Sequence, residues 1–380
     1  MKLWIALLGL VAVGQQAPHA PLPVNDAALP MRKVWKTYPV YHPDKAPPDY
    51  IEWLRTQSPE EITAPDGETL FHAPMVIGSL GQRPPTDPPF LHDRAWFDRV
   101  NPPLNREGAI TGFVYVLRTK GKVEIGTYSC AMCHTRVMRN GAVIKGAAGN
   151  FPVEAALALD VETSAGVPAM RDANKDLLRR VFGFTGEFSI PSAAKLLTTR
   201  AAGQIPDLNG LGGRRYLTHT GLYEIQSPAD LARYVSGKQH LYAPDARASA
   251  EQVQALVPYL SGLKAPVSPV KADKTTRLGE KVFEREGCAQ CHAKETKLTP
   301  AAVVGTDPAM AMDARAGTGH YRVPSLQGLW YRGTLSHTGE GTSLEDWLSP
   351  VRLQYLKGHE YGFKLSSTDR FALIAYLRTL

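Results

Sequence analysis

The sequence is poor in cysteine and has none outside two short motifs. Its four cysteines form CxxCH twice, as CAMCH at 130–134 and as CAQCH at 288–292. No thiol is left over for a disulfide framework, so none is expected. The chain also lacks an apolar run of the roughly 20 residues that a membrane-spanning helix needs. We therefore predict no transmembrane segment.

The sequence has no strong excess of one charge and no motif typical of nucleic-acid binding. Its formal net charge of +7 comes from 43 lysines and arginines against 36 acidic residues. A mildly basic, solvated surface accounts for this balance. We predict no nucleic-acid partner.

Each CxxCH copy has the spacing that is typical of covalent c-type haem attachment. On a helical turn, residues three and four positions apart share a face, so two thiols and one imidazole can point the same way. The sequence therefore predicts two covalently attached haems, with His134 and His292 as proximal iron ligands. The predicted haem-binding residues are Cys130, Cys133, His134, Cys288, Cys291 and His292.

Two other interpretations of the motifs stay open. The four cysteines could bind one structural zinc ion, but both histidines would then have no role. A thioredoxin-like dithiol site needs one CxxC beside a βαβ pattern and has no use for a second copy. Haem attachment accounts for every residue of both motifs, so it is the favoured interpretation.

The stretch before the first motif differs in composition from the rest. Residues 1–14, MKLWIALLGLVAVG, combine a lysine with a short apolar run, which is typical of a secretory signal peptide. A periplasmic or secreted protein is expected. Residues 15–105 hold more than half of the 30 prolines, which predicts a loop-rich N-terminal extension without long helices or central strands. Alternation around Lys-Gly at 113–128 predicts a small β-hairpin.

The chain contains an internal duplication. IPDLNGLGGRRYLTHTG at 205–221 aligns without gaps on VPSLQGLWYRGTLSHTG at 323–339, with nine identical positions. ALVPYLSGL at 255–263 matches ALIAYLRTL at 372–380. Each half therefore has the same order: CxxCH, a Pro-x-Leu segment ending in His-Thr-Gly, and a terminal amphipathic helix.

This order predicts a mainly α fold with two tandem cytochrome c-type domains, at 106–263 and 274–380. A proline-containing linker at 264–273 joins them.

In the second domain, a helix before CxxCH is expected to cross the terminal helix. Leu278, Val282 and Phe283 are predicted to share its apolar face. Gly279 lies beside them and is small enough to let the terminal helix approach closely.

The sixth position of each iron decides between electron transfer and binding of a small oxidant. Downstream of His292 the candidates are Met310, Met312, His320, His337 and His359. His359 is favoured because its loop, just before the terminal helix, should return across the distal face. Its repeat partner is His240, in KQHLY against KGHEY. If His240 ligates the first iron, both haems are six-coordinate; otherwise the first iron is open.

His219 and His337 end the duplicated segment in the same His-Thr-Gly setting. A histidine beside a turn glycine fits a hydrogen-bonding role. Both are expected to tie down a loop or contact a haem propionate rather than to bind iron.

The layout resembles the bacterial dihaem cytochrome c peroxidase superfamily over roughly residues 126–380. The two CxxCH motifs, the VPSLQGLWYRGTLSHTG block and the tail LKGHEYGFKLSSTDRFALIAYLRTL carry this resemblance. The second domain is most similar to the rubber-oxygenase branch. The resemblance implies that the first haem, with His134 as its proximal ligand, is reactive. It also implies that the second haem, ligated by His292 and His359, relays electrons.

Some features typical of peroxidases in that superfamily have no counterpart here. No histidine lies between Thr135 and Gln204, and 210–213 reads Gly-Leu-Gly-Gly where a glutamate is usual. A positioned acid or base contributes about 10²–10⁴-fold to a reaction, so ordinary peroxidase activity is in doubt. The bridging tryptophan also lacks an obvious counterpart, although Trp330 is a nearby candidate.

The expected function is that of a secreted dihaem oxidoreductase whose first haem activates peroxide or oxygen. The alternative is a non-enzymatic electron-transfer protein with both haems six-coordinate. The redox partner could be a small cytochrome, a cupredoxin or a quinone-linked donor, and the oligomeric state is not indicated. Calcium between the domains is known in the peroxidases, but no acidic ligand cluster supports it here.

Overall fold

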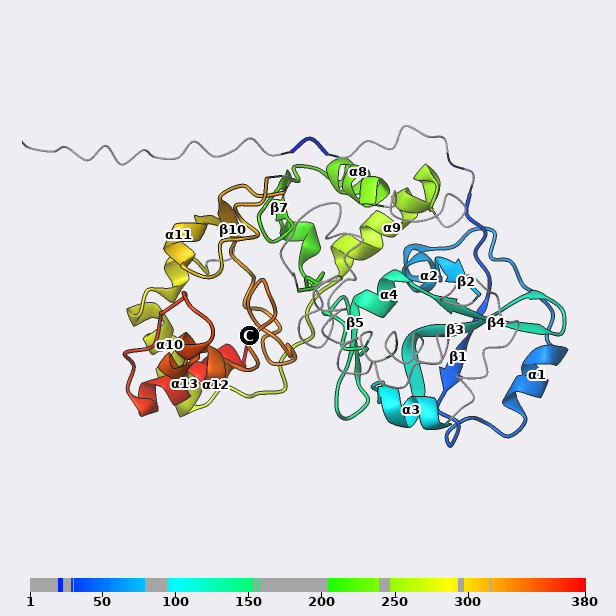
Figure 1. Cartoon of the computed structure of the whole chain (residues 1–380), viewed down its shortest axis with the longest axis horizontal. Helices are drawn as coiled ribbons and strands as arrows, with labels where there is room; N and C mark the ends of the chain where they lie inside the picture. The colour runs from blue at the N-terminus through cyan, green and yellow to red at the C-terminus, as the bar shows by residue number, and fades with distance from the viewer. Residues whose placement is uncertain are drawn as a thin grey trace, which may run out of the picture.

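A computed structural model of the chain describes residues 20–22, 29, 31–78, 94–152, 156, 204–238, 247–292, 297–314 and 316–380. The predicted signal peptide at 1–14 lies outside these residues. A four-stranded sheet lies at one end of the molecule, and the crossed helices α10 (Lys274–Arg285) and α13 (Ser367–Leu377) lie at the other (Figure 1). Within the described part of the chain, no helix has both the length and the apolar character needed to cross a membrane.

The sheet is antiparallel and has the strand order β1-β3-β4-β2. Its central hairpin consists of β3 (Ala109–Thr119) and β4 (Lys122–Thr127), in the segment where the sequence predicts a hairpin. β1 (Thr37–Tyr41) and β2 (Val76–Ile77) pair with it at the two edges. Both edge strands come from the proline-rich stretch at 15–105, so this stretch completes the sheet. Edge strands tolerate the proline within TYPVY because one of their sides needs no hydrogen bond.

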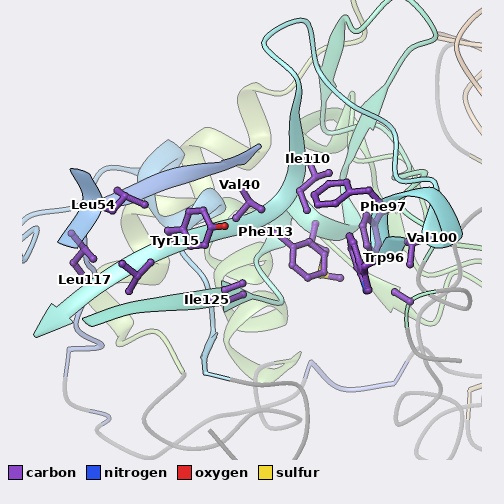
Figure 2. Packing of buried hydrophobic residues seen from close by; sticks show 14 of the residues in the cluster. Val40, Leu54, Trp96, Phe97, Val100, Ile110, Phe113, Tyr115, Leu117 and Ile125 are labelled. Carbon is purple, nitrogen blue, oxygen red and sulfur yellow. The ribbon is translucent and has the colours of Figure 1, made fainter. Parts of the chain in front are cut away.

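An aromatic core packs against the sheet (Figure 2). The helix α3 (Arg94–Val100) contributes Trp96 and Phe97 to it. The ring of Trp96 meets that of Phe113 edge to face, with centroids 6.3 Å apart. Met132, inside the first CxxCH motif, belongs to the same core. The first motif is therefore anchored on the sheet.

The described chain contains further helices, strands and 3₁₀ turns. They are α1 (Tyr50–Thr56), β5 (Thr135–Val137), β6 (Val143–Lys145), β7 (Tyr216–Leu217), β8 (Tyr223–Glu224), α8 (Pro228–Lys238), β9 (Leu298–Pro300), α11 (Ala301–Val304), β10 (His320–Arg322) and α12 (Leu344–Trp347), with the 3₁₀ turns η4 (Leu211–Gly213), η7 (Cys288–Gln290) and η8 (Pro350–Gln354).

The helices α10 and α13 cross at Gly279. A Cβ atom at this glycine would lie 2.0 Å from the carbonyl oxygen of Ala372, so no side chain fits there. Val282 and Phe283 are buried in the same contact, as the sequence predicts. The prediction for Leu278 is wrong, because its side chain is 38% exposed. The buried stripe runs through Thr276, Gly279, Val282 and Phe283 at spacings of three and four residues, and Leu278 lies one position outside it.

A matching crossing occurs in the first half, between α2 (Gly67–His72) and α9 (Ala250–Gly262). A Cβ atom at Gly67 would lie 2.5 Å from the carbonyl oxygen of Ala255, the repeat partner of Ala372. Gly-Glu-Thr-Leu-Phe at 67–71 therefore corresponds in space to Gly-Glu-Lys-Val-Phe at 279–283. The helix that crosses α9 lies before residue 106, where the sequence predicts that the first domain begins.

The two halves meet through a reciprocal pair of backbone hydrogen bonds. The N–H of Gln204 donates to the carbonyl of His337 at 2.9 Å, and the N–H of Arg322 donates to that of His219 at 2.7 Å. Gln204 and Arg322 occupy equivalent positions of the duplication, as do His219 and His337. The duplicated segments therefore contact each other as the two sides of an isologous interface do.

The glycine crossings can be tested with single substitutions. Gly279→Ala is expected to lower the free energy of unfolding by about 1–3 kcal/mol or more, because the new methyl group would overlap the backbone of α13. Gly67→Ala should have a similar effect through α9. Gly262→Ala, in the last turn of α9 with open space around it, is the control and should change stability by less than about 1 kcal/mol. Chemical denaturation followed by circular dichroism measures all three. Equal stabilities would show that the close approach does not exist.

Candidate functional site

The first CxxCH motif forms one short helix, α4 (Cys130–Cys133). The hydroxyl of Ser129 caps it by accepting a hydrogen bond from the N–H of Met132 at 3.2 Å. The N–H of His134 donates to the carbonyl of Cys130 at 2.9 Å, which continues the helical turn. Both thiols and the imidazole are therefore held on one turn, as the motif requires.

The second CxxCH motif has a similar turn on a different support. Gly287, with a φ of 72° that favours glycine, precedes the 3₁₀ turn η7. The N–H of His292 donates to the carbonyl of Cys288 at 2.9 Å, as in the first motif. Cys288 packs against the core that α10 and α13 form. Each motif is thus attached to the core of its own half.

Burial disfavours ionisation of three of the four thiols. All four cysteines are free. Burial raises the pKa of Cys133 to about 12 and also raises the pKa values of Cys130 and Cys288. A protonated thiol is a poor nucleophile and not a metal ligand. In the described ranges no three His, Cys, Asp or Glu side chains gather to hold a metal ion, so the four cysteines are not grouped around one point.

The histidines of the two CxxCH motifs lie beside repeat-equivalent prolines. Nδ1 of His292 donates to the carbonyl of Pro324 at 3.1 Å, which leaves Nε2 available as a ligand. Nδ1 of His134 is buried without a hydrogen-bond partner of good geometry. The nearby backbone of Pro206 raises the pKa of the His134 imidazole. Burial has the larger, opposite effect and lowers the pKa of His134 to about 4. Both imidazoles are therefore neutral at neutral pH, the state that binds a metal.

A cavity of about 260 Å³ opens between the two halves, near the lower end of the size range of ligand pockets, about 300–1,000 Å³. Its wall includes both thiols of the second motif, and most of its exposed lining is apolar. Residues of the first half complete it. The charged and histidine side chains in the lining include His292, His359, Asp207, Arg214, Arg322 and Arg332.

His359 faces His292 in this cavity at a distance that fits two axial ligands. Their ring centroids are 6.2 Å apart. A histidine nitrogen lies about 2.0–2.1 Å from a bound transition metal such as zinc, and about 1.1 Å from the centroid of its own ring. Two histidines on opposite sides of one ion therefore have ring centroids about 6.2–6.4 Å apart. Nδ1 of His359 is buried without a hydrogen-bond partner among the described residues. The separation of the two ring centroids therefore equals that expected for two histidines that share one metal ion.

A buried arginine shapes the loop that carries His359. Arg352 is fully buried. It donates to the carbonyls of Trp347 at 3.1 Å, Leu356 at 3.0 Å, Gly358 at 2.7 Å and His359 at 3.1 Å. Its guanidinium also lies 4.2 Å from the centre of the Trp347 ring. His359 has a φ of 48°, a left-handed conformation that is costly for this residue. Arg352 therefore stabilises the strained turn that directs His359 into the cavity.

Of the other candidates for the sixth position, Met310, Met312 and His320 do not line the cavity, whereas His337 does. Met310 is buried in a small separate cluster, and Met312 is 70% exposed. The ring of His320 bonds to a neighbouring backbone carbonyl. His240, the candidate for the first iron, lies outside the described residues, so its ligation stays a prediction.

The histidines of the two His-Thr-Gly segments are hydrogen-bonded to backbone. Nε2 of His219 donates to the carbonyl of Gln204 at 2.7 Å, and Nε2 of His337 donates to that of Asp307 at 3.1 Å. The ring of His337 also stacks on that of Tyr321. The predicted loop-tying role of both histidines is confirmed.

The aromatic residue at the junction is a tyrosine. Trp330 does not line the cavity and donates through Nε1 to the carbonyl of Pro266 at 3.3 Å. Its neighbour Tyr331 is buried, lines the cavity, and donates to Oδ2 of Asp207 at 2.8 Å. The sequence analysis did not single out Tyr331 or Arg352. Neither has a local signal, because their roles depend on contacts made through folding.

Comparisons with known proteins give little more. No protein-family model matches the chain, and no curated protein matches it. Among solved structures it is similar to a hydrazine synthase from Kuenenia stuttgartiensis, solved under xenon pressure, with 14% identity and a TM-score of 0.34. The match covers 47% of this chain and 72% of that chain. A likeness at this level carries no conclusion, so function has to be argued from the chain's own residues.

Proposed function

We propose that this chain is a periplasmic or secreted c-type cytochrome with two covalently attached haems in two tandem cytochrome c-type domains, and that it acts as an oxidoreductase. The spacing of His292 and His359 carries the proposal. The ring centroids of these two neutral imidazoles are 6.2 Å apart, and two thiols line the same cavity. This set of groups matches the donor set of a six-coordinate c-type haem.

The residues of the second site have separate roles in this proposal. Cys288 and Cys291 would attach the haem, and His292 and His359 would bind its iron. Arg352 holds the His359 loop in place. A haem bound in this way supplies reversible one-electron transfer, and one with an open position also supplies activation of peroxide or oxygen. With both positions filled by histidine, the second site would relay electrons.

The first site would hold the reactive haem, attached through Cys130 and Cys133 with His134 as proximal ligand. This assignment follows the resemblance to the dihaem cytochrome c peroxidase superfamily and its rubber-oxygenase branch. The sequence has no histidine between residues 135 and 204 to act as a distal acid or base. Binding of oxygen or peroxide at an open iron is therefore favoured over ordinary peroxidase turnover.

The second candidate function is electron transfer without catalysis, with both haems six-coordinate. The observation that favours it is the repeat match of KQHLY with KGHEY, which pairs His240 with His359. The two functions differ in one property, the coordination number of the first iron.

The second haem site is tested by His359→Ala. The purified protein is expected to contain two haems that resist acid-acetone extraction, at least one of them low-spin in the ferric state. His359→Ala should keep both haems and convert one to high-spin, because an axial ligand is lost. Resonance Raman and electronic spectra measure this. His320→Ala is the control and should leave the spectra unchanged. Extractable pigment, or a variant with unchanged low-spin haem, would contradict the proposal.

The first iron is tested by His240→Ala. For an oxidoreductase with an open first haem, the wild-type ferric protein already contains one high-spin haem, and the substitution leaves its spectrum unchanged. If the protein is instead an electron carrier, the wild type is wholly low-spin, and His240→Ala creates a high-spin signal. Electron paramagnetic resonance of the two proteins distinguishes the outcomes.

The role of Arg352 is tested by Arg352→Gln. Loss of most of four buried hydrogen bonds, each contributing about 0.5–1.5 kcal/mol, should release the His359 loop. A high-spin fraction is then expected to appear at the second haem and to grow on warming, together with binding of carbon monoxide to the ferrous form. Arg378→Gln, which removes an exposed pair with Glu345, is the control. A variant with a lower melting temperature but unchanged spin state would assign Arg352 a purely structural role.

A further inference from the structure

Three arginines converge on the cavity wall at the junction of the two halves. Arg214 comes from the first half, and Arg322 and Arg332 come from the second. Arg214 is 8% exposed, and the side chain of Arg332 is 15% exposed. Arg214 and Arg332 are also equivalent positions of the duplication. The cluster therefore exists only because the halves are joined.

Backbone contacts hold each guanidinium but do not use all of its donors. Arg214 donates to the carbonyl of Asn209 at 2.7 Å, and Nε of Arg322 donates to the carbonyl of Thr218 at 3.1 Å. Arg332 donates to two carbonyls of its own segment. Both terminal nitrogens of Arg322 are without an acceptor among the described residues. The cluster thus offers oriented N–H groups to the cavity.

The positive charge of the cluster is not balanced by protein. Asp207 is the single acidic residue among the described residues that line the cavity. Its Oδ2 accepts from Tyr331 at 2.8 Å and lies 3.6 Å from Nε of Arg332. Arg136 also lines the cavity, so four guanidiniums face a single carboxylate and the net charge of the lining is +3. Uncompensated charge in a poorly solvated site is costly, so an anion is expected to neutralise it.

Arg214 and Arg322 stay charged at neutral pH. Burial, reinforced by repulsion from Arg214 and Arg332, lowers the pKa of Arg322 to about 9. Burial likewise lowers the pKa of Arg214 to about 10. Deprotonation therefore does not relieve the imbalance at neutral pH.

We propose that Arg214, Arg322 and Arg332 form a carboxylate-binding site, occupied by the two propionate groups of the haem attached to the second CxxCH motif. This inference rests on the proposed function. The cavity that contains the cluster also contains His292 and His359, and a haem between them would bring two carboxylates, whose charge of −2 would offset most of the excess positive charge of the lining. Arginine suits this role because its planar fork can bind both oxygens of a carboxylate.

The site has a consequence for electron transfer. A guanidinium beside the haem carboxylates favours the ferrous state, because reduction adds one negative charge to the haem. Since Arg214 belongs to the first half, that half helps to set the midpoint potential of the second haem. A second source of the same chemistry is a free dicarboxylate that enters from solution.

The experiment compares midpoint potentials of the haem-loaded full-length protein. Arg322→Gln should lower the equilibrium constant for reduction of the second haem about tenfold, which is about 59 mV for one electron. Arg322→Lys keeps the charge and should restore at least half of that shift. Arg215→Gln, at an exposed residue paired with Glu224, should cause no shift. If Arg322→Gln does not fold, Arg332→Gln provides a second removal of charge. Spectroelectrochemistry measures the potentials.

Three results would overturn the proposal, and a haem count separates them from failure of the proposed function. An unchanged midpoint potential in Arg322→Gln, with two haems still attached, would refute the carboxylate site but not the proposed function. A second refuting result is a saturable spectral change on adding succinate to the wild type that is absent in Arg322→Gln, with no difference in midpoint potential between the two proteins. The occupant of the site would then be a free anion. A midpoint potential in Arg322→Lys as low as that in Arg322→Gln would exclude a charge effect. A wild type without covalent haem would instead refute the proposed function.

Discussion

The structure depends on the reciprocal hydrogen bonds through which the two duplicated segments meet. Gln204 bonds to His337 and Arg322 bonds to His219, each from backbone N–H to backbone carbonyl. Because the bonds use backbone groups at equivalent positions, they fix the register of one half against the other independently of side-chain identity. The cavity, its arginines and the Tyr331–Asp207 contact all lie at this junction.

The duplication preserves a scaffold and changes what is attached to it. Each half has a glycine-centred helix crossing, a helical CxxCH turn and a histidine beside a proline. The first half inserts α3 and the hairpin of β3 and β4 between its crossing helix and its motif, and the second half has the strained His359 loop. The scaffold thus presents two thiols and an imidazole on one turn in both halves, while the additions give each motif a different environment.

Buried arginines serve two different purposes in this protein. Arg352 is satisfied by four backbone carbonyls and an aromatic face, so its role is to stabilise one loop conformation. Arg214 and Arg322 have fewer protein partners and face a cavity with a single carboxylate. The number of unused donors, rather than burial itself, separates a structural arginine from one that can bind a ligand.

The sequence by itself determined the features that depend on local spacing. CxxCH places its thiols and imidazole on one turn, and Gly279 marks a close helix contact, because the helical period relates neighbouring residues directly. Tertiary structure decided the rest. The counterpart of Gly279 is Gly67, which the interposed hairpin separates from its motif, and Leu278 is exposed because the partner helix approaches one position further along. The junction arginines and the distance between His292 and His359 are set by how the halves dock, which no spacing along the chain encodes.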